Sequence, residues 1–171
     1  MNAAVVTSFD TPPTYTTFPD PTPAPDEALI TVTACALHQV VRSSASGQHY
    51  TSKAQFPFIP GVDAAGHLAR ALHDIPANTR VYCGGTRFPY GTFAEQTVAP
   101  ALIIPLPDNV EDALAAAIAN PAMSSWMALD RARFSPGESV LILGATGTSG
   151  QLAIQIAKSR GATHIVAAGR N

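Results

Sequence analysis

The sequence predicts an α/β plus β fold, in which a β-rich amino-terminal domain precedes the first βαβ unit of a parallel α/β domain. Three observations support this prediction. Short segments of alternating apolar and polar residues fill the first part of the chain, which also contains most of its 15 prolines. From Val110 the pattern becomes helical, and after Ser139 an apolar run breaks at a glycine-rich turn and resumes with helical spacing. These changes divide the chain into residues 1–120 and residues 121–171.

The β-rich part contains several segments with the composition of strands. In the first of them Leu29 and Thr31 alternate with Ile30 and Val32, as expected of a strand with two different faces. A proline-rich connector, Pro19–Pro25, is interpreted as extended chain rather than as a recognition motif. The predicted strands are Glu27–Leu37, Ala65–Ala71, Arg80–Cys83, Phe93–Val98 and Leu102–Leu106.

Two helical segments separated by a proline are expected next. Glu111–Ala119 is rich in alanine and follows Asp108 or Asn109, either of which can cap a helix. Pro121 is expected to interrupt the helix because proline lacks a backbone N–H. The helical pattern then resumes over Ser124–Arg133.

The glycine-rich turn is the most informative motif. Val140–Leu143 is predicted to be a strand buried on both faces, and an AxGxxG arrangement with one additional glycine follows it. Glycines allow a tight turn and a close approach of the backbone to a pyrophosphate, and a helix beginning near Ser149 would direct free N–H groups at the phosphates. The alternative is an ordinary strand–helix segment whose glycines serve packing only. The predicted dinucleotide-binding residues are Gly144, Ala145, Thr146, Gly147, Thr148 and Gly150.

A second strand completes the βαβ unit. Leu152 and Ile156 give the helix an apolar face, Gly161 is a suitable stop, and His164–Ala168 is a short apolar strand. Two parallel strands do not form a stable sheet without further cover. We therefore expect this domain to be incomplete: either the chain is a fragment, or a partner covers the exposed edges.

The tip of the second strand indicates which dinucleotide is bound. NAD sites usually carry a carboxylate there for the adenosine ribose, whereas NADP sites carry a cation. The chain reads Gly169, Arg170 and Asn171, and Arg170 is suited to a forked contact with a 2′-phosphate. The sequence therefore predicts NADP(H) as the cofactor, bound in part by these three residues; the alternative is a solvated arginine.

Composition narrows the possible partners. Hydrophobic residues make up 46%, charged residues 13%, and the formal net charge is −2, so neither nucleic acid nor an anionic membrane is expected as a partner. The amino terminus does not resemble a signal peptide, which predicts a cytoplasmic protein. The expected partner is a small-molecule substrate. Cys35 and Cys83 form no CxxC motif and are interpreted as small buried apolar residues.

The order of these elements resembles the medium-chain dehydrogenase/reductase superfamily. The resemblance rests on Pro57–Gly66, Gly91–Glu95, Met123–Leu129 and the glycine turn. It is strongest to the zinc-independent quinone oxidoreductase branch, and it implies a GroES-like catalytic domain followed by the start of a Rossmann domain. Members commonly dimerise through the nucleotide domain, so a homodimer is implied if that domain is complete.

The resemblance also bears on zinc. Zinc-dependent members of the superfamily carry a cysteine and a His-Glu pair at positions that match Leu37 and Val62-Asp63. Catalytic zinc needs three protein ligands, and the remaining conceivable ligands, His38, His49, His67 and Asp63, have no recognisable spacing. We therefore predict no metal site.

Without zinc, reduction requires a side chain that donates a hydrogen bond to the substrate oxygen as negative charge develops. By resemblance, His38 replaces an asparagine of the branch, and Tyr50 matches a tyrosine near the nicotinamide. Arg42 and Tyr90 are additional candidates on neighbouring loops. Ser124 matches a threonine beside the nicotinamide amide, although a helix-capping role is equally simple.

The preferred interpretation is an NADPH-dependent, zinc-independent oxidoreductase that transfers hydride to a quinone or an α,β-unsaturated carbonyl. One alternative is a truncated, non-catalytic relative that binds nucleotide weakly or serves as a subunit. A zinc-dependent alcohol dehydrogenase is the other.

Overall fold

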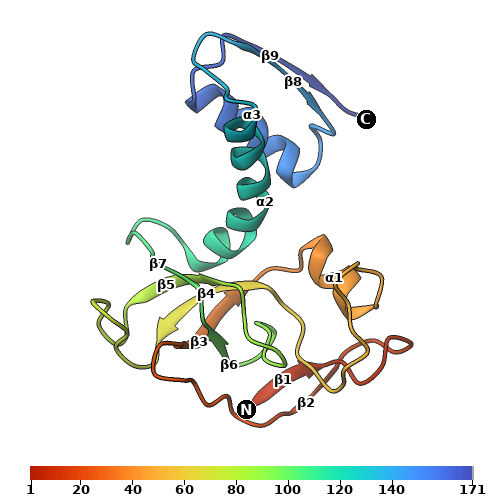
Figure 1. Ribbon diagram of the computed structural model, residues 1–171, viewed down its shortest axis with the longest axis vertical. Coiled ribbons are helices and arrows are strands. Elements are labelled where there is room, and N and C mark those ends of the chain that lie inside the picture. Colours follow the sequence, from red (N-terminus) through yellow and green to blue (C-terminus); the bar gives the residue numbers. More distant parts are fainter. Residues whose placement is uncertain (171) are drawn as a thin grey trace. The chain divides into compact units, whose positions relative to one another are not determined.

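A computed structural model describes residues 1–170 of the chain (Figure 1). It divides into two compact units, Met1–Ala117 and the part from Ile118 onward, with the boundary inside the long helix α2. None of the helices formed by the described residues is long and apolar enough to cross a membrane.

The first unit is built on a five-stranded antiparallel sheet with the order β6-β3-β4-β5-β7. A short antiparallel hairpin of β1 (Asn2–Val5) and β2 (Thr14–Thr17) and the helix α1 (Gln39–Ala45) accompany it. The strands of the sheet are β3 (Ala28–Cys35), β4 (Asp63–Leu68), β5 (Arg80–Gly84), β6 (Gln96–Ala99) and β7 (Leu102–Pro105).

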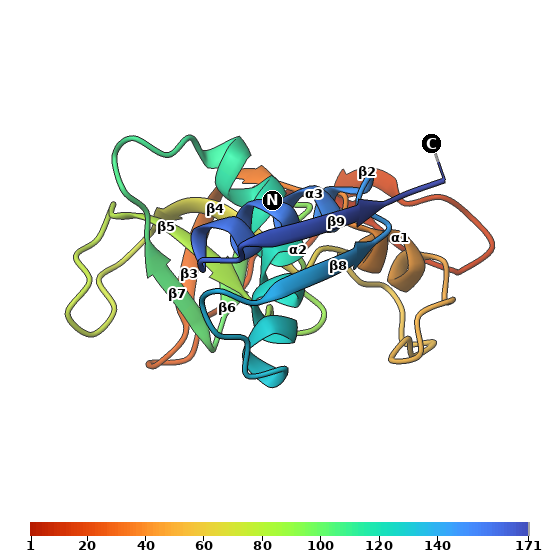
Figure 2. The same cartoon turned by 90° about the horizontal axis from the view of Figure 1, so that it is seen from above.

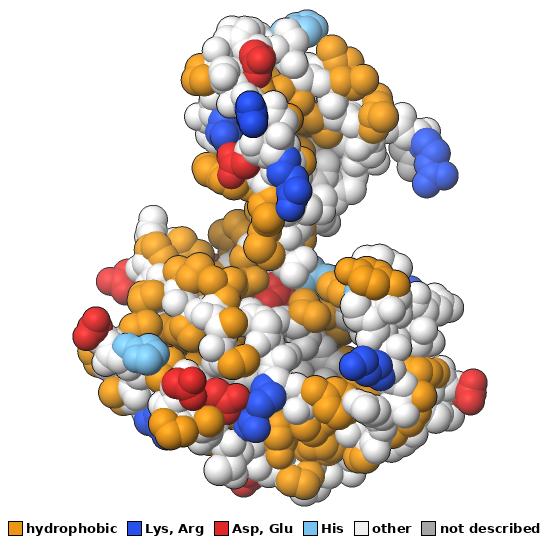
Figure 3. Space-filling model, in the orientation of Figure 1, with side chains coloured by type: hydrophobic (Ala, Val, Ile, Leu, Met, Phe, Trp, Pro, Cys, Tyr) orange, Lys and Arg blue, Asp and Glu red, His pale blue; other side chains and the backbone are white. Residues whose placement is uncertain are grey.

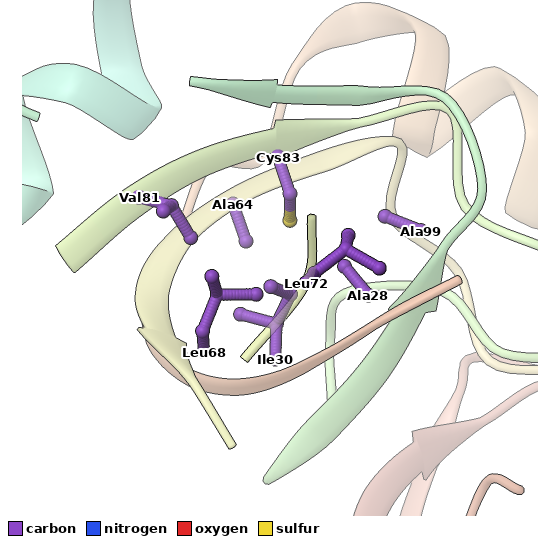
Figure 4. Packing of buried hydrophobic residues seen from close by; sticks show 8 residues of the cluster. All are labelled: Ala28, Ile30, Ala64, Leu68, Leu72, Val81, Cys83 and Ala99. Carbon is purple, nitrogen blue, oxygen red and sulfur yellow. The ribbon is translucent and has the colours of Figure 1, made fainter. Parts of the chain in front are cut away.

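One face of this sheet forms the main core. Ile30, Leu68, Val81 and Cys83 are almost fully buried and point toward a common centre (Figure 4). The alternation of β3 explains this arrangement, because Ala28 and Ile30 enter the core while Thr31 and Thr33 face the other way. The cluster consists of Ala28, Ile30, Ala64, Leu68, Leu72, Val81, Cys83 and Ala99.

All five predicted strands are present, and the limits of two of them differ from the prediction by three residues at one end. The strand predicted over Ala65–Ala71 begins at Asp63 and ends at Leu68, because Leu72 instead forms an isolated bridge with Ile75. The strand predicted over Phe93–Val98 begins at Gln96, since the Phe93 carbonyl accepts the Ala4 N–H at 2.8 Å and so pairs with β1. Pairing between distant segments, which periodicity does not encode, sets these limits.

The helix α2 (Asp112–Arg131) corrects two predictions. It runs through Pro121 without a break, so the expected interruption there is wrong. Proline removes one backbone donor, but the alanines and methionines around it are strong helix formers. The predicted cap at Asp108 or Asn109 is also wrong, because residues 107–110 form a turn closed by the Val110 N–H and the Pro107 carbonyl at 3.1 Å.

The second unit contains the predicted βαβ arrangement. The strands β8 (Ser139–Leu143) and β9 (His164–Ala168) run parallel, with Ser139 opposite His164, and Figure 2 shows them side by side. Between them lies α3 (Thr148–Ser159), which ends as predicted before Gly161, whose φ is +88°. Ile142, Ala145 and Ala157 form the small core of this unit.

The prediction that the first of these strands is buried on both faces is wrong. Leu141 and Leu143 are 63% and 75% exposed, whereas Ile142 is buried. Hydrophobic side chains accordingly gather at the surface of this unit (Figure 3). The physical reason is that, within the described residues, the helices cover one face of β8 and nothing covers the other.

Candidate functional site

The glycine turn between β8 and α3 borders a cavity of about 710 Å³. This arrangement follows from the parallel pairing, which brings the carboxyl ends of β8 and β9 to the same edge. The Ala145 N–H donates to the Ala168 carbonyl at 3.0 Å and fixes the turn against the second strand. The lining residues are Leu143, Gly144, Thr146, Gly147, Ala168, Gly169 and Arg170.

The three glycines of the turn differ in whether the fold requires glycine at their position. Gly144 adopts a φ of +75°, which side chains disfavour. A Cβ on Gly150 would lie 2.3 Å from the Gly144 carbonyl oxygen and 2.6 Å from Ala145 Cα, so α3 could not pack this closely against the turn. A Cβ on Gly147 would meet its nearest atom at 3.6 Å, and the φ of this residue is −78°. The fold therefore requires glycine at 144 and 150 but not at 147.

At Gly147 a ligand, rather than the fold, would require glycine. It is the N-cap residue of α3 and provides no side-chain cap, so the first N–H groups of the helix have no side-chain acceptor there. Helix N-termini of this kind bind phosphate groups, and a bare backbone at the cap permits close contact. The residues present thus fit the diphosphate of a dinucleotide.

Other predicted cofactor residues are distributed around this turn. Thr146 lines the cavity, and its carbonyl accepts a hydrogen bond from Gln151 Nε2 at 2.9 Å. Thr148 begins α3, and Ala145 belongs to the unit's core. Arg170 lines the cavity with Gly169, and Asn171 lies outside the described residues.

Ser124 lies on α2, where its hydroxyl donates to the Pro121 carbonyl at 3.0 Å. The capping role considered from the sequence does not apply, because Ser124 is inside a continuous helix. Its hydroxyl is occupied by this local bond, and its side chain is exposed.

A second candidate site lies in the first unit, where His38 is the N-cap residue of α1. Its Nε2 atom is 3.4 Å from Oδ1 of Asp63, the first residue of β4. The other oxygen of Asp63 accepts a hydrogen bond from the Tyr82 hydroxyl at 2.7 Å. Asp63 and Tyr82 are buried and the His38 side chain is 11% exposed, so the three form one polar cluster.

Burial dominates the electrostatics of this cluster. Desolvation raises the pKa of Asp63 above its ordinary value, and the hydrogen bond from Tyr82 and the nearby His38 counteract this only in part. Burial likewise raises the pKa of the Tyr82 hydroxyl, reinforced by its bond to Asp63. The thiols of Cys35 and Cys83 respond in the same way, and burial raises the pKa of Cys83 to about 12. The two thiols and the Tyr82 hydroxyl therefore favour their neutral forms near pH 7.

The other predicted catalytic residues are dispersed over the first unit. Arg42 lies one turn after His38 on α1 and lines an apolar cavity of about 550 Å³ with Leu37 and Val41. Tyr50 is 92% exposed, and its ring lies tilted against that of His49 at a centroid distance of 4.4 Å. Tyr90 packs edge-on against Phe18 at 5.8 Å, beside the hairpin core.

Asp63 and Tyr82 were not predicted as functional residues. Asp63 was considered only as a conceivable metal ligand, although an aspartate directly before Ala-Ala-Gly in a strand was a usable signal. Within residues 1–170, no three His, Cys, Asp or Glu side chains gather closely enough to hold a metal ion. Of the three positions that match zinc ligands by resemblance, Leu37 and Val62 are apolar, and Asp63 accepts the Tyr82 hydroxyl.

Comparison with known proteins adds independent information. A probable NADPH-dependent quinone reductase from Emericella nidulans is 31% identical, with 99% of this chain and 55% of that protein covered. A quinone oxidoreductase from Mus musculus is 35% identical, with 82% and 43% covered. The chain spans about half the length of the curated relatives that it matches. No protein-family model matches it.

Solved structures resemble the chain over nearly its full length. The quinone oxidoreductase of Thermus thermophilus, whose complex with NADPH is also known, superimposes with a TM-score of 0.84 at 27% identity. The match covers 99% of this chain and 54% of that protein. The architecture is therefore that of a GroES-like domain followed by the beginning of a Rossmann domain, as predicted.

Proposed function

Because the chain belongs to the medium-chain dehydrogenase/reductase superfamily, we propose that it acts as an NADPH-dependent, zinc-independent oxidoreductase. Its substrate is a quinone or an α,β-unsaturated carbonyl compound. The observation that supports this proposal best is Gly147, a glycine that the fold does not need and a diphosphate does. The names of the relatives, which include an NADPH-dependent quinone reductase, point to the same chemistry.

The second unit supplies the cofactor-binding residues. The backbone amides between Thr146 and Gly150 bind the diphosphate, and the positive end of the α3 dipole adds to this attraction. Arg170 binds the 2′-phosphate that distinguishes NADP(H) from NAD(H). When bound, the reduced nicotinamide supplies the hydride.

The first unit supplies the groups that receive the developing charge. His38 is the N-cap residue of α1, its Nε2 lies 3.4 Å from Oδ1 of Asp63, and its side chain is 11% exposed. It therefore donates a hydrogen bond to the substrate oxygen as that oxygen becomes negative. Arg42 and the exposed ring of Tyr50 are secondary contacts for the substrate.

A zinc-independent reaction is supported by the chemistry of the residues. Leu37 and Val62 provide no donor atom where zinc-dependent relatives provide ligands. Asp63 is already bonded to Tyr82 and faces His38. A cytoplasmic location and a homodimer remain predictions, and light scattering of the purified protein tests the second.

Titration with NADPH and NADH, followed by turnover with a panel of small quinones and enones, tests the proposal. We expect NADPH to bind more tightly than NADH, and quinone reduction to be insensitive to a chelator. Turnover that disappears with chelator and returns with added zinc would overturn the metal assignment. Failure to bind either dinucleotide would overturn the proposal as a whole.

A further inference from the structure

The apolar cavity of about 550 Å³ lies wholly within the first unit. It is bordered by α1 and by residues 9–13 of the loop between β1 and β2, which lie near each other in both Figure 1 and Figure 2. Protein pockets that bind small molecules measure about 300–1,000 Å³ and combine a mostly apolar lining with a few placed polar groups. The cavity has this size and composition, so a small molecule can occupy it without any part of the second unit.

The walls of the cavity are fixed by packing. Val41, on α1, is 1% exposed and is anchored in the interior. On the loop side, the Phe9 ring packs edge-on against Phe56 at a centroid distance of 4.8 Å. A Cβ on Gly47 would lie 2.6 Å from the Phe9 ring, so this ring uses space that only a glycine leaves open. The cavity is therefore pre-formed, which lowers the entropic cost of binding.

The exposed surface of the lining favours an apolar ligand. Leu37 lines the cavity and is 64% exposed, although it directly precedes the N-cap residue of α1 and lies only four residues before the buried Val41. Removing such apolar surface from water is favourable and roughly proportional to the area removed. A hydrocarbon body in contact with Leu37 would bury this surface.

Arg42 is the cationic side chain of the lining. It lies on α1 and is exposed, and within residues 1–170 its guanidinium forms no ion pair or side-chain hydrogen bond. By contrast, Arg80, Arg87 and Arg160 each pair with a carboxylate. A guanidinium presents a planar fork of donors that matches the two oxygens of a carboxylate. Arg42 is thus complementary to an acid whose apolar body lies in the cavity.

The remaining polar groups of the lining narrow the choice of acid. Asp10, on the loop, also lines the cavity and forms no ion pair with Arg42 in the described chain. Its carboxylate would repel a second acidic group on the ligand. The hydroxyls of Thr11 and Ser46 are already hydrogen-bonded to neighbouring residues. A single carboxylate therefore suits this cavity better than two.

We propose that this cavity is a binding site for a monocarboxylic acid with an apolar body, aromatic or aliphatic. The carboxylate binds the guanidinium of Arg42, and the hydrocarbon packs between Phe9 and the side chains of Leu37 and Val41. All of these residues belong to the first unit. The site consequently binds its ligand without a dinucleotide and does not depend on the proposed reductase activity.

NMR titration of the whole chain, without dinucleotide, tests the proposal. The probes are 2-naphthoate, the aliphatic acid octanoate, and 2-naphthamide, which has nearly the shape of 2-naphthoate but no charge. An acid of this size in a pre-formed pocket should bind with a dissociation constant of roughly 1 mM or lower. The amide should bind about tenfold more weakly than 2-naphthoate, because its oxygen carries no full charge. Comparison of the two acids identifies which apolar body the cavity prefers.

Two variants test the two halves of the site. Arg42→Gln removes the charge and should weaken 2-naphthoate about tenfold while changing 2-naphthamide less than about threefold, and Arg42→Lys should restore part of the loss. Ala45→Leu places a larger side chain on the part of α1 that lines the cavity and should weaken all three probes. Arg131→Gln removes another exposed cation, and Gln39→Leu adds a leucine to α1 outside the cavity. Both of these controls should bind the probes as the wild-type protein does, and thermal unfolding verifies that each variant is folded.

The outcomes are distinct. An acid whose binding is weakened by both Arg42→Gln and Ala45→Leu supports the proposal. Absence of binding to the wild-type protein at several millimolar overturns it, as does an affinity that Ala45→Leu leaves unchanged. Equal affinities for 2-naphthoate and 2-naphthamide, or no effect of Arg42→Gln, also overturn it, because the cavity then takes a neutral compound. Since no dinucleotide or quinone is present, a failure of NADPH binding or quinone reduction refutes the proposed function and leaves this result intact.

Discussion

Substitution of Gly147 separates binding from folding more sharply than any other change in the glycine turn. A Cβ at this position would have 3.6 Å to its nearest neighbour, the Gly144 carbonyl oxygen, and the backbone φ of −78° suits any residue. Serine is a preferred N-cap residue, whereas glycine here offers no side-chain acceptor. Gly147→Ser should therefore leave the free energy of unfolding unchanged or raise it by up to about 1 kcal/mol.

Binding should respond in the opposite direction. The new side chain occupies the cavity beside the first free amides of α3, where the diphosphate must approach the backbone. Loss of that approach should weaken NADPH at least about tenfold, which corresponds to about 1.4 kcal/mol. Isothermal titration calorimetry measures the affinity, and thermal unfolding measures the stability of the same samples.

Gly150→Ala and Gly144→Ala are matched controls in the same turn. The first places a Cβ 2.3 Å from a carbonyl oxygen, and overpacking of this kind should destabilise the unit by about 1–3 kcal/mol or more. The second has free space around its Cβ but a φ of +75°, so backbone strain alone should cost about 1–2 kcal/mol. If the Gly147→Ser protein binds NADPH as tightly as the wild-type protein, the proposal that Gly147 makes room for the cofactor is refuted.

Three further changes test other parts of the structure. Arg170→Ala should weaken NADPH far more than NADH in calorimetry, and equal losses would remove Arg170 from the 2′-phosphate site. At pH values above the pKa of Asp63, Asp63→Asn should raise Tm, because a carboxyl whose pKa is raised on folding makes the protein less stable as pH rises through that pKa. A Tm of Asp63→Asn below that of the wild-type protein at high pH would contradict this. Asp112 has a lowered pKa, chiefly through the Thr33 hydroxyl and then Arg80, so its contribution is present above about pH 4 and lost as pH falls further. Asp112→Asn should therefore cost roughly 1–2 kcal/mol at pH 7 and less at low pH, and an equal loss across a urea-unfolding pH series would refute the linkage.

Some features of the candidate site could not be predicted from the sequence. The spacing of the glycines predicted the turn, but only the backbone dihedral angles and distances show that Gly147 differs from Gly144 and Gly150. Nor did the sequence predict that the Tyr90 ring packs against Phe18, which lies far earlier in the chain. Such contacts depend on how distant segments meet, and no local pattern reports them.

Local patterns nevertheless established much of the architecture. Apolar periodicity and a stop at Gly161 located both strands and the helix of the second unit, because these features reflect backbone preferences that act over a few residues. Motif order along the chain indicated the superfamily, which the relatives confirm.

Tertiary structure decided the rest. The continuity of α2 through Pro121, the exposed face of β8 and the cluster of His38, Asp63 and Tyr82 all depend on which elements come together. The cluster joins a helix start to two strands, and strand register fixes which side chains share a face. A residue's chemical type can be known from its letter, but its partner and its exposure to water are properties of the folded chain.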